Sequence, residues 1–113
     1  MSEPQPEKNS RYQSLFQAGR IGKLQLGNRL IMAAMGNALA DDRGNVTGPM
    51  LAYYSARAKG GVGMVITQFA SISADDYIPY NLRIDNDSYI TGIKRLITTI
   101  HEQGTRACIQ LMH

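Results

Sequence analysis

The stretch GNRLIMAAMGN, residues 27–37, decides the fold. A polar Asn-Arg pair leads directly into the apolar run RLIMAAM at residues 29–35, which ends at Gly36. A short continuous apolar run is typical of a strand that is buried on both faces of a sheet. The run therefore predicts such a strand, yet its last residues carry almost no side-chain chemistry. They form either a plain core strand followed by a turn, or a strand end whose backbone contacts a ligand.

Turn and cap residues on either side of this run delimit a hairpin and a helix. Residues 15–27 alternate around glycines and predict a small hairpin with its turn at residues 22–23. After the turn-rich loop DDRGNVTG begins a predicted helix, with Thr47 as a good N-cap and Pro49 in its first turn. We expect this helix to end at the glycine pair 60–61.

The second half of the chain repeats the pattern of strand, helix and strand. The apolar run at residues 62–68 predicts a second buried strand, and residues 70–85 predict a polar loop. Asn86 offers a helix start, Gly104 a helix end, and residues 105–112 predict a third strand. Between the two helix signals, apolar residues recur at helical spacing: Ile90, Ile93, Leu96, Ile97 and Ile100.

This alternation of buried strands with helices favours parallel βαβ units. A hairpin, about three parallel strands and two helices would leave both edges of such a sheet unpaired. The sequence therefore predicts an α/β fold that is incomplete as given, the opening part of a larger α/β barrel.

Composition narrows the function classes. The chain has 113 residues, 43% of them apolar and 19% charged, as in an ordinary globular domain. Its net charge of +3 comes from scattered basic residues without a nucleic-acid module, so we expect no nucleic-acid partner. A single cysteine, Cys108, excludes an intrachain disulfide and a cysteine metal cluster, which favours a reduced, cytoplasmic protein.

The sequence also lacks membrane and export signals. No apolar run approaches the roughly 20 residues of a membrane span, so we expect no membrane partner. Residues 1–14 are polar, contain proline and lack the apolar region of a signal peptide, so they predict a disordered leader before a domain at 15–113.

Separate blocks of residues, in order, resemble one family. They are LFQAGRIGKLQLGNRLIMAAMG at 15–36, YYSARAKGGVGMVIT at 53–67 and IQLMH at 109–113. In order and spacing they resemble the N-terminal part of the old yellow enzyme family of NADH:flavin oxidoreductases. The branch that they resemble most is the 2,4-dienoyl-CoA reductase and NADH oxidase-like group.

The resemblance implies the N-terminal portion of an FMN-binding (β/α)8 TIM barrel, whose active site lies at the carboxyl ends of the strands. It places Ala34, Met35 and Gly36 beside the isoalloxazine ring, where small residues allow close backbone approach. Ala34 departs from the proline that many relatives carry. The resemblance makes Gln110 a hydrogen-bonding partner of the pyrimidine edge of FMN. The alternative is a strand glutamine bonded to backbone.

Two further positions remain less defined. Phe69 falls where relatives commonly carry Gly or Ala close to the flavin, so its ring either stacks near the cofactor or substrate or shifts the loop. His113 matches a strand-end histidine that either contacts substrate or anchors a loop. Three residues of the second block are assigned to packing or a surface ion pair: Tyr53, Tyr54 and Arg57. No catalytic or metal-binding residue is expected in this segment.

The residues and the resemblance leave two alternative functions for the chain. The first is an FMN-dependent oxidoreductase that moves hydride from NAD(P)H through FMN to an activated alkene, such as an enoyl or dienoyl substrate. The segment is then an N-terminal fragment that is inactive alone, and FAD and a 4Fe-4S cluster would require further domains downstream. The second is a non-catalytic α/β fragment that works by pairing with another chain or as a homo-oligomer.

Overall fold

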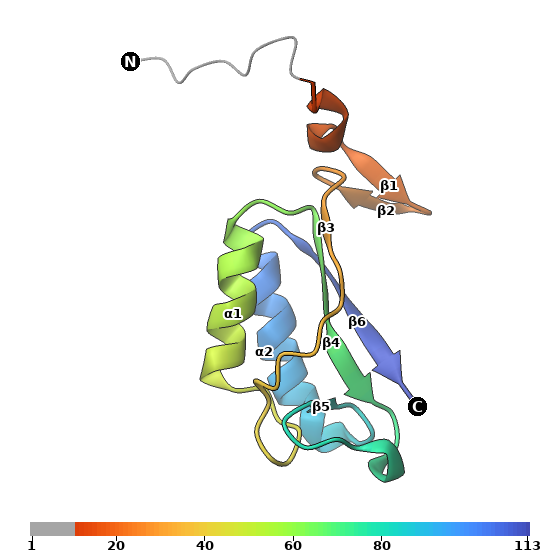
Figure 1. Cartoon of the computed structure of the whole chain (residues 1–113), viewed down its shortest axis with the longest axis vertical. Helices are drawn as coiled ribbons and strands as arrows, with labels where there is room; N and C mark the ends of the chain where they lie inside the picture. Colours follow the sequence, from red (N-terminus) through yellow and green to blue (C-terminus); the bar gives the residue numbers. More distant parts are fainter. Residues whose placement is uncertain (1–10) are drawn as a thin grey trace.

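A small parallel sheet with two helices on one face forms the body of the computed structural model, which describes residues 11–113 (Figure 1). Its long central strand is β4 (Met64–Ser71), which pairs in parallel with β6 (Arg106–Met112) along its length. The opposite edge of β4 pairs with β3 (Ile31–Met32) at its start and with β5 (Leu82–Arg83) at its end, again in parallel. The parallel βαβ arrangement predicted from the sequence is confirmed.

The predicted hairpin is also confirmed. Strands β1 (Gly19–Ile21) and β2 (Leu24–Leu26) pair antiparallel around a turn in which Gly22 has a φ of 57°. The hairpin lies at the end of the sheet where β4 and β6 begin, far from their carboxyl ends (Figure 1). Arg106, the first residue of β6, fixes it there by donating from Nε to the Gln25 carbonyl at 3.0 Å.

Both helices begin and end near the predicted residues. In α1 (Gly48–Lys59) the Thr47 side chain accepts a hydrogen bond from Met50 N at 3.3 Å, and Gly60 is the C-cap. A 3-10 helix at Asp87–Tyr89, capped by the Asn86 side chain, leads into α2 (Ile90–His101). Of the predicted leader at 1–14, residues 1–10 lie outside the described residues. Residues 11–14 form a turn and the start of a 3-10 helix at Gln13–Phe16.

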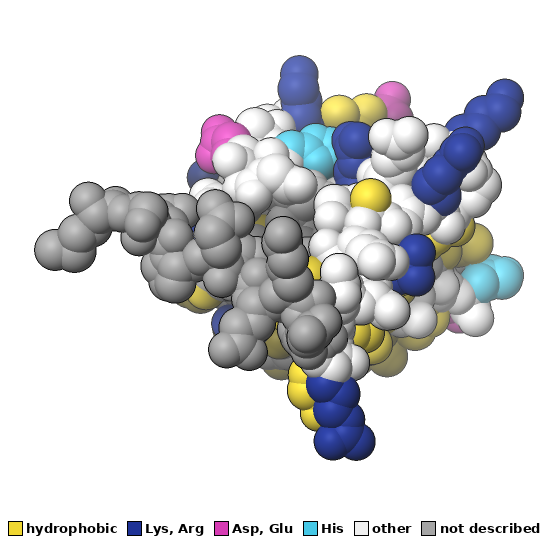
Figure 2. Space-filling model, turned by 90° about the horizontal axis from the view of Figure 1, so that it is seen from above, with side chains coloured by type: hydrophobic (Ala, Val, Ile, Leu, Met, Phe, Trp, Pro, Cys, Tyr) yellow, Lys and Arg dark blue, Asp and Glu magenta, His cyan; other side chains and the backbone are white. Residues whose placement is uncertain are grey.

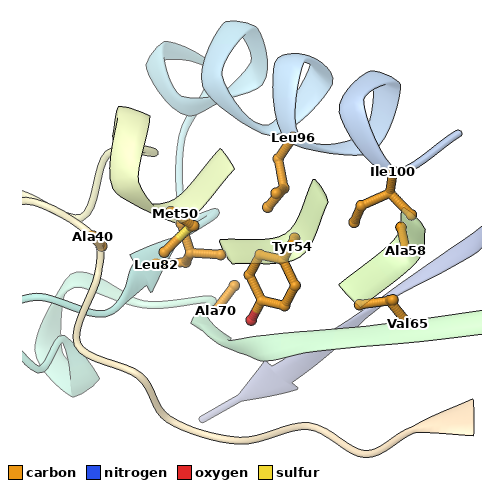
Figure 3. Packing of buried hydrophobic residues seen from close by; sticks show 9 residues of the cluster. All are labelled: Ala40, Met50, Tyr54, Ala58, Val65, Ala70, Leu82, Leu96 and Ile100. Carbon is orange, nitrogen blue, oxygen red and sulfur yellow. The ribbon is translucent and has the colours of Figure 1, made fainter. Parts of the chain in front are cut away.

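The hydrophobic core lies between these helices and the sheet (Figure 3). It combines side chains from both helices with side chains from β4, β5 and the loop before α1. Nine buried residues form it: Ala40, Met50, Tyr54, Ala58, Val65, Ala70, Leu82, Leu96 and Ile100. Burial of these apolar surfaces is the main force that holds α1 and α2 on the sheet.

Two predictions about the strands are wrong. Residues 29–35 are not buried on both faces, because α1 and α2 cover only one face, and Ile31 and Met35 are 43% and 51% exposed. Only Ile31 and Met32 pair as a strand. The predicted strand at 62–68 runs instead from 64 to 71, and the predicted loop at 70–85 contains a 3-10 helix at Ala74–Asp76 as well as β5.

A glycine lets β3 approach β4. Gly63 donates its N–H to the Leu30 carbonyl at 2.9 Å, and the Asn28 side chain bonds both Leu30 N and the Gly61 carbonyl. A Cβ atom added at Gly63 would lie only 2.5 Å from the Asn28 carbonyl oxygen. This contact is with backbone, which cannot rotate away as a flexible side chain could.

We expect Gly63→Ala to lower the free energy of unfolding by about 1–3 kcal/mol, because the methyl group forces β3 and β4 apart. Urea denaturation of the two proteins measures the loss. Gly48→Ala is the matched control, since no atom lies within 4 Å of a Cβ atom added there. Equal stability of the two variants would contradict this account of the contact.

Candidate functional site

β3, β4 and β6 run parallel, so β4 and β6 finish at the same end of the sheet, and the chain after β3 continues toward that end (Figure 1). Met35 and Gly36 follow β3 at this end, and Phe69 lies near the end of β4. A Cβ atom added at Gly36 would lie 3.9 Å from Phe69 Cε1, so the ring lies against this glycine. The structure therefore brings two of the predicted site residues together.

Gln110 lies near the end of β6, opposite an irregularity in β4. Thr67 pairs with Ile109, but the next pair is Ala70 with Leu111, so Gln68 and Phe69 together face Gln110. This extra residue is a β-bulge. Because Ile109 packs against the core, alternation along β6 turns Gln110 toward the face that the helices leave uncovered.

The Gln110 side chain is exposed, and within residues 11–113 its amide makes no hydrogen bond. The alternative of a strand glutamine bonded to backbone is thus not what the described residues show. An amide offers both donors and an acceptor. This side chain is therefore available to a ligand lying over the uncovered face.

His113 makes a contact of its own. Its Nδ1 lies 2.6 Å from Asp76 Oδ2, in the 3-10 helix that follows β4. This pair ties the end of β6 to the loop after β4, as the anchoring alternative expects. Ala34 is half-buried beside Met35.

A buried polar cluster, which the sequence analysis missed, lies beneath these strand ends. It consists of Asn37, Tyr54 and Gln68, and the exposed fractions of Tyr54 and Gln68 are 1% and 0%. Tyr54 Oη accepts from the Gln68 backbone N–H at 2.7 Å and from Asn37 Nδ2 at 3.2 Å. Gln68 Nε2 donates to Asn37 Oδ1.

Two more backbone groups complete this cluster. Gln68 Oε1 accepts from Leu82 N at 3.1 Å, and Asn37 Oδ1 accepts from Leu39 N at 3.1 Å. The sequence predicts Tyr54 as a packing residue, whereas its hydroxyl also accepts two hydrogen bonds. The signal was present in the sequence, because Gln68 stands in an apolar run and a buried amide needs partners. Gln110 also stands in an apolar strand, yet its side chain is exposed.

Burial raises the pKa of Tyr54 above its usual value of 10.0 and outweighs the hydrogen bonds from Gln68 and Asn37, which lower it. The hydroxyl is therefore neutral at physiological pH. In Figure 3 it points from α1 toward the sheet, where it bonds to β4.

A second polar group fixes the loops at the same end. Arg83 bonds Asp85 through two nitrogens at 2.8 and 2.7 Å and lies over the rings of Tyr77 and Tyr89. The hydrogen bonds from Arg83 lower the pKa of Asp85. Tyr89 Oη donates to the Arg43 carbonyl at 2.8 Å, which joins the loop before α1 to the start of α2. These contacts hold the loops around β5 and before α1 in place.

Three further observations concern metal binding, membrane crossing and surface charge in the part of the chain that the structure describes. No group of three or more His, Cys, Asp or Glu residues is placed to bind a metal ion there. Neither α-helix of residues 11–113 has the length and apolar character needed to cross a bilayer. Lys and Arg side chains stand apart on the face in Figure 2. A groove of about 590 Å³ runs along α2 and is lined by Ile84, Ile90 and Ile97.

Comparison with protein families and curated proteins gives consistent matches. Residues 14–113 match the model of the NADH:flavin oxidoreductase / NADH oxidase family. The chain is 36% identical over 90% of its length to an NADH oxidase of Thermoanaerobacter brockii and 32% identical over 88% to an NADPH dehydrogenase of Halalkalibacterium halodurans. It is 37% identical over 88% to an NADH:acrylate oxidoreductase of Vibrio harveyi. It spans 16%, 30% and 10% of these relatives' lengths.

Solved structures match as well. A 2-naphthoyl-CoA reductase in complex with 2-naphthoyl-CoA superposes with a TM-score of 0.86 at 29% identity, covering 90% of this chain and 16% of that one. The old yellow enzyme homologue of Zymomonas mobilis gives 0.80 at 27% identity, covering 88% and 28%. These matches confirm the predicted fold class, the N-terminal portion of a (β/α)8 barrel.

We expect Tyr54→Phe to lower the free energy of unfolding at pH 7 by about 1–3 kcal/mol, because the Gln68 N–H is left buried without its acceptor. Tyr53→Phe is the matched control in the neighbouring residue, for which a change below about 0.5 kcal/mol is expected. Urea denaturation measures both. Losses of similar size would show that the hydroxyl of Tyr54 contributes nothing specific.

Tyr54→Phe also changes how the free energy of unfolding depends on pH in the alkaline range. The pKa of Tyr54 is raised by folding, so its stabilising contribution is complete below pH 10 and is lost as the pH rises through the raised value. Between pH 8 and 12 the free energy of unfolding should therefore decrease less steeply with pH for Tyr54→Phe than for the unsubstituted chain. Urea denaturation at a series of pH values measures it. A steeper fall for the variant would contradict this sign.

Proposed function

The chain belongs to the NADH:flavin oxidoreductase / NADH oxidase family, as its sequence resemblance predicted, and we propose that residues 15–113 are the N-terminal segment of an FMN-dependent oxidoreductase barrel. FMN supplies hydride transfer from NAD(P)H to an activated alkene, such as an enoyl or dienoyl substrate. Acrylate, named for the Vibrio harveyi relative, is an alkene activated by a carboxylate. This relative supports the proposed substrate class.

The observation that carries the proposal is the grouping of cofactor-compatible residues at the strand ends. Gly36 has no side chain to block a planar ring, and Met35 is exposed beside it. Gln110 presents an amide without a partner among residues 11–113 on the uncovered face of the sheet. A backbone that can be approached closely and an amide at the ring edge are what a flavin requires.

In this proposal each residue has a separate role. The Ala34–Gly36 backbone would lie beside the isoalloxazine ring, and the Gln110 amide would donate to the pyrimidine edge, where it would stabilise negative charge on the reduced ring. Phe69 contributes an apolar surface next to Gly36. The proposal assigns cofactor contacts, and no proton donor, to residues 15–113.

We expect Gln110→Ala to weaken FMN binding about tenfold, because a hydrogen bond to the ring edge is lost. Quenching of FMN fluorescence by the purified chain measures the dissociation constant. Gln103→Ala is the matched control, since Gln103 is an exposed glutamine in the turn after α2. Equal affinities of the two variants would exclude Gln110 from the site.

The same titration separates the proposal from its alternative. A chimera in which residues 14–113 replace the matched segment of the Thermoanaerobacter brockii NADH oxidase supplies the remainder of a barrel. Stoichiometric FMN and oxidation of NADH by the chimera support the oxidoreductase. A folded chimera without FMN would contradict it and favour a non-catalytic segment that pairs with another chain.

A further inference from the structure

The segment that follows β3 has almost no strand pairing to hold it. The ladder between β3 and β4 ends at Met32, and residues 33–39 adopt no regular secondary structure. Ala38 has a φ of 53°, in the left-handed region that residues with a side chain rarely adopt. Such a conformation persists only where surrounding contacts enforce it.

Side-chain hydrogen bonds from Asn37 replace the missing ladder. Asn37 directly follows Gly36, and its amide bonds Leu39 N, Tyr54 Oη and Gln68 Nε2. The Thr47 hydroxyl also donates to the Leu39 carbonyl. The backbone next to Met35 and Gly36 is therefore held in place by buried side chains of α1 and β4.

The hydrogen bonds also fix which way each amide points. Leu82 N donates to Gln68 Oε1, so Gln68 Nε2 must face Asn37. Asn37 Oδ1 then receives both Gln68 Nε2 and Leu39 N, while its Nδ2 donates to Tyr54 Oη. Rotating the Asn37 amide by 180° would place its NH2 group against two donors. Position 68 thus requires an uncharged amide that donates as well as accepts.

We propose that Asn37 and Gln68 are positioning residues for the cofactor, because their paired amides fix the Met35–Gly36 backbone against which the flavin ring lies. This inference rests on the proposed function. Neither residue touches the ligand in this account. Both act through the backbone of the strand end, and Gln68 also holds β5 through Leu82 N.

The test compares Gln68→Glu with Gln103→Glu in the whole chain. Gln68→Glu keeps the acceptor for Leu82 N but turns an oxygen toward Asn37 Oδ1, whereas Gln103→Glu makes the same chemical change at an exposed site. Because a buried charge can unfold the chain, Asn37→Ala is the second variant. It removes the hydrogen bond between the two amides at Asn37, which is half-buried, and introduces no charge.

Two quantities are measured. Amide hydrogen exchange of residues 33–40 needs no flavin, and the FMN dissociation constant is taken in the chain or in the chimera, whichever binds FMN. In Gln68→Glu and Asn37→Ala we expect the exchange rate of the Leu39 N–H to rise about tenfold and the FMN affinity to fall about tenfold. The exchange rates of α2 amides should stay unchanged in both variants. Gln103→Glu should change neither quantity. A merely destabilising substitution would speed exchange throughout the core instead.

Each other outcome overturns one statement. Unchanged exchange at residues 33–40 would show that the paired amides do not fix the strand end. Faster exchange with unchanged FMN affinity would show that the strand end is fixed but does not position the cofactor. Failure of the unsubstituted chain and of the chimera to bind FMN would overturn the proposed function itself, and no variant is needed to see it.

Discussion

Parallel pairing of β4 with its neighbours is the constraint on which the rest of the structure depends. β4 is the only strand of residues 11–113 that pairs with three others, and its first residues pair β3 while its last pair β5. Because the strands run the same way, β4, β5 and β6 finish at one end of the sheet, and the chain after β3 continues toward it. Residues 35–37, 68–69 and 110 then come together, although they are far apart in the sequence.

The β-bulge at Gln68 and Phe69 is the second constraint. Val65 and Ala70 both belong to the core, yet they are five residues apart, which strict alternation in a strand does not allow. The extra residue corrects the phase and lets Ala70 face the helices. It also leaves Phe69 to lie against Gly36 while Gln68 is buried between β5 and Asn37. The irregularity thus forms the surface of the candidate site and its support at once.

Burial of an amide at this position has a physical reason. An apolar side chain in place of Gln68 would leave the buried Leu82 N–H without its acceptor, at a cost of about 1–3 kcal/mol, and would leave Asn37 Oδ1 with Leu39 N as its one remaining donor. The amide satisfies both and joins three segments: the end of β3, β4 and β5. Within residues 11–113 no buried side-chain nitrogen or oxygen atom lacks a hydrogen bond. A cluster satisfied in this way holds one arrangement rather than several.

The sequence by itself determined the hairpin, the two helices, the order of the three longer predicted strands and the family. Local signals are sufficient for these, since Thr47, Pro49 and Asn86 begin their helices through contacts within a few residues, and the hairpin turn needs only Gly22. Only the tertiary structure decided which residues are buried and which groups their side chains bond. Every second residue of the run at 29–35 is exposed, because no helix covers its second face. Strand β5 escaped prediction because two residues carry no periodicity. Which of two strand glutamines is buried depends on a bulge and on Tyr54, 14 residues away, and no local pattern contains that information.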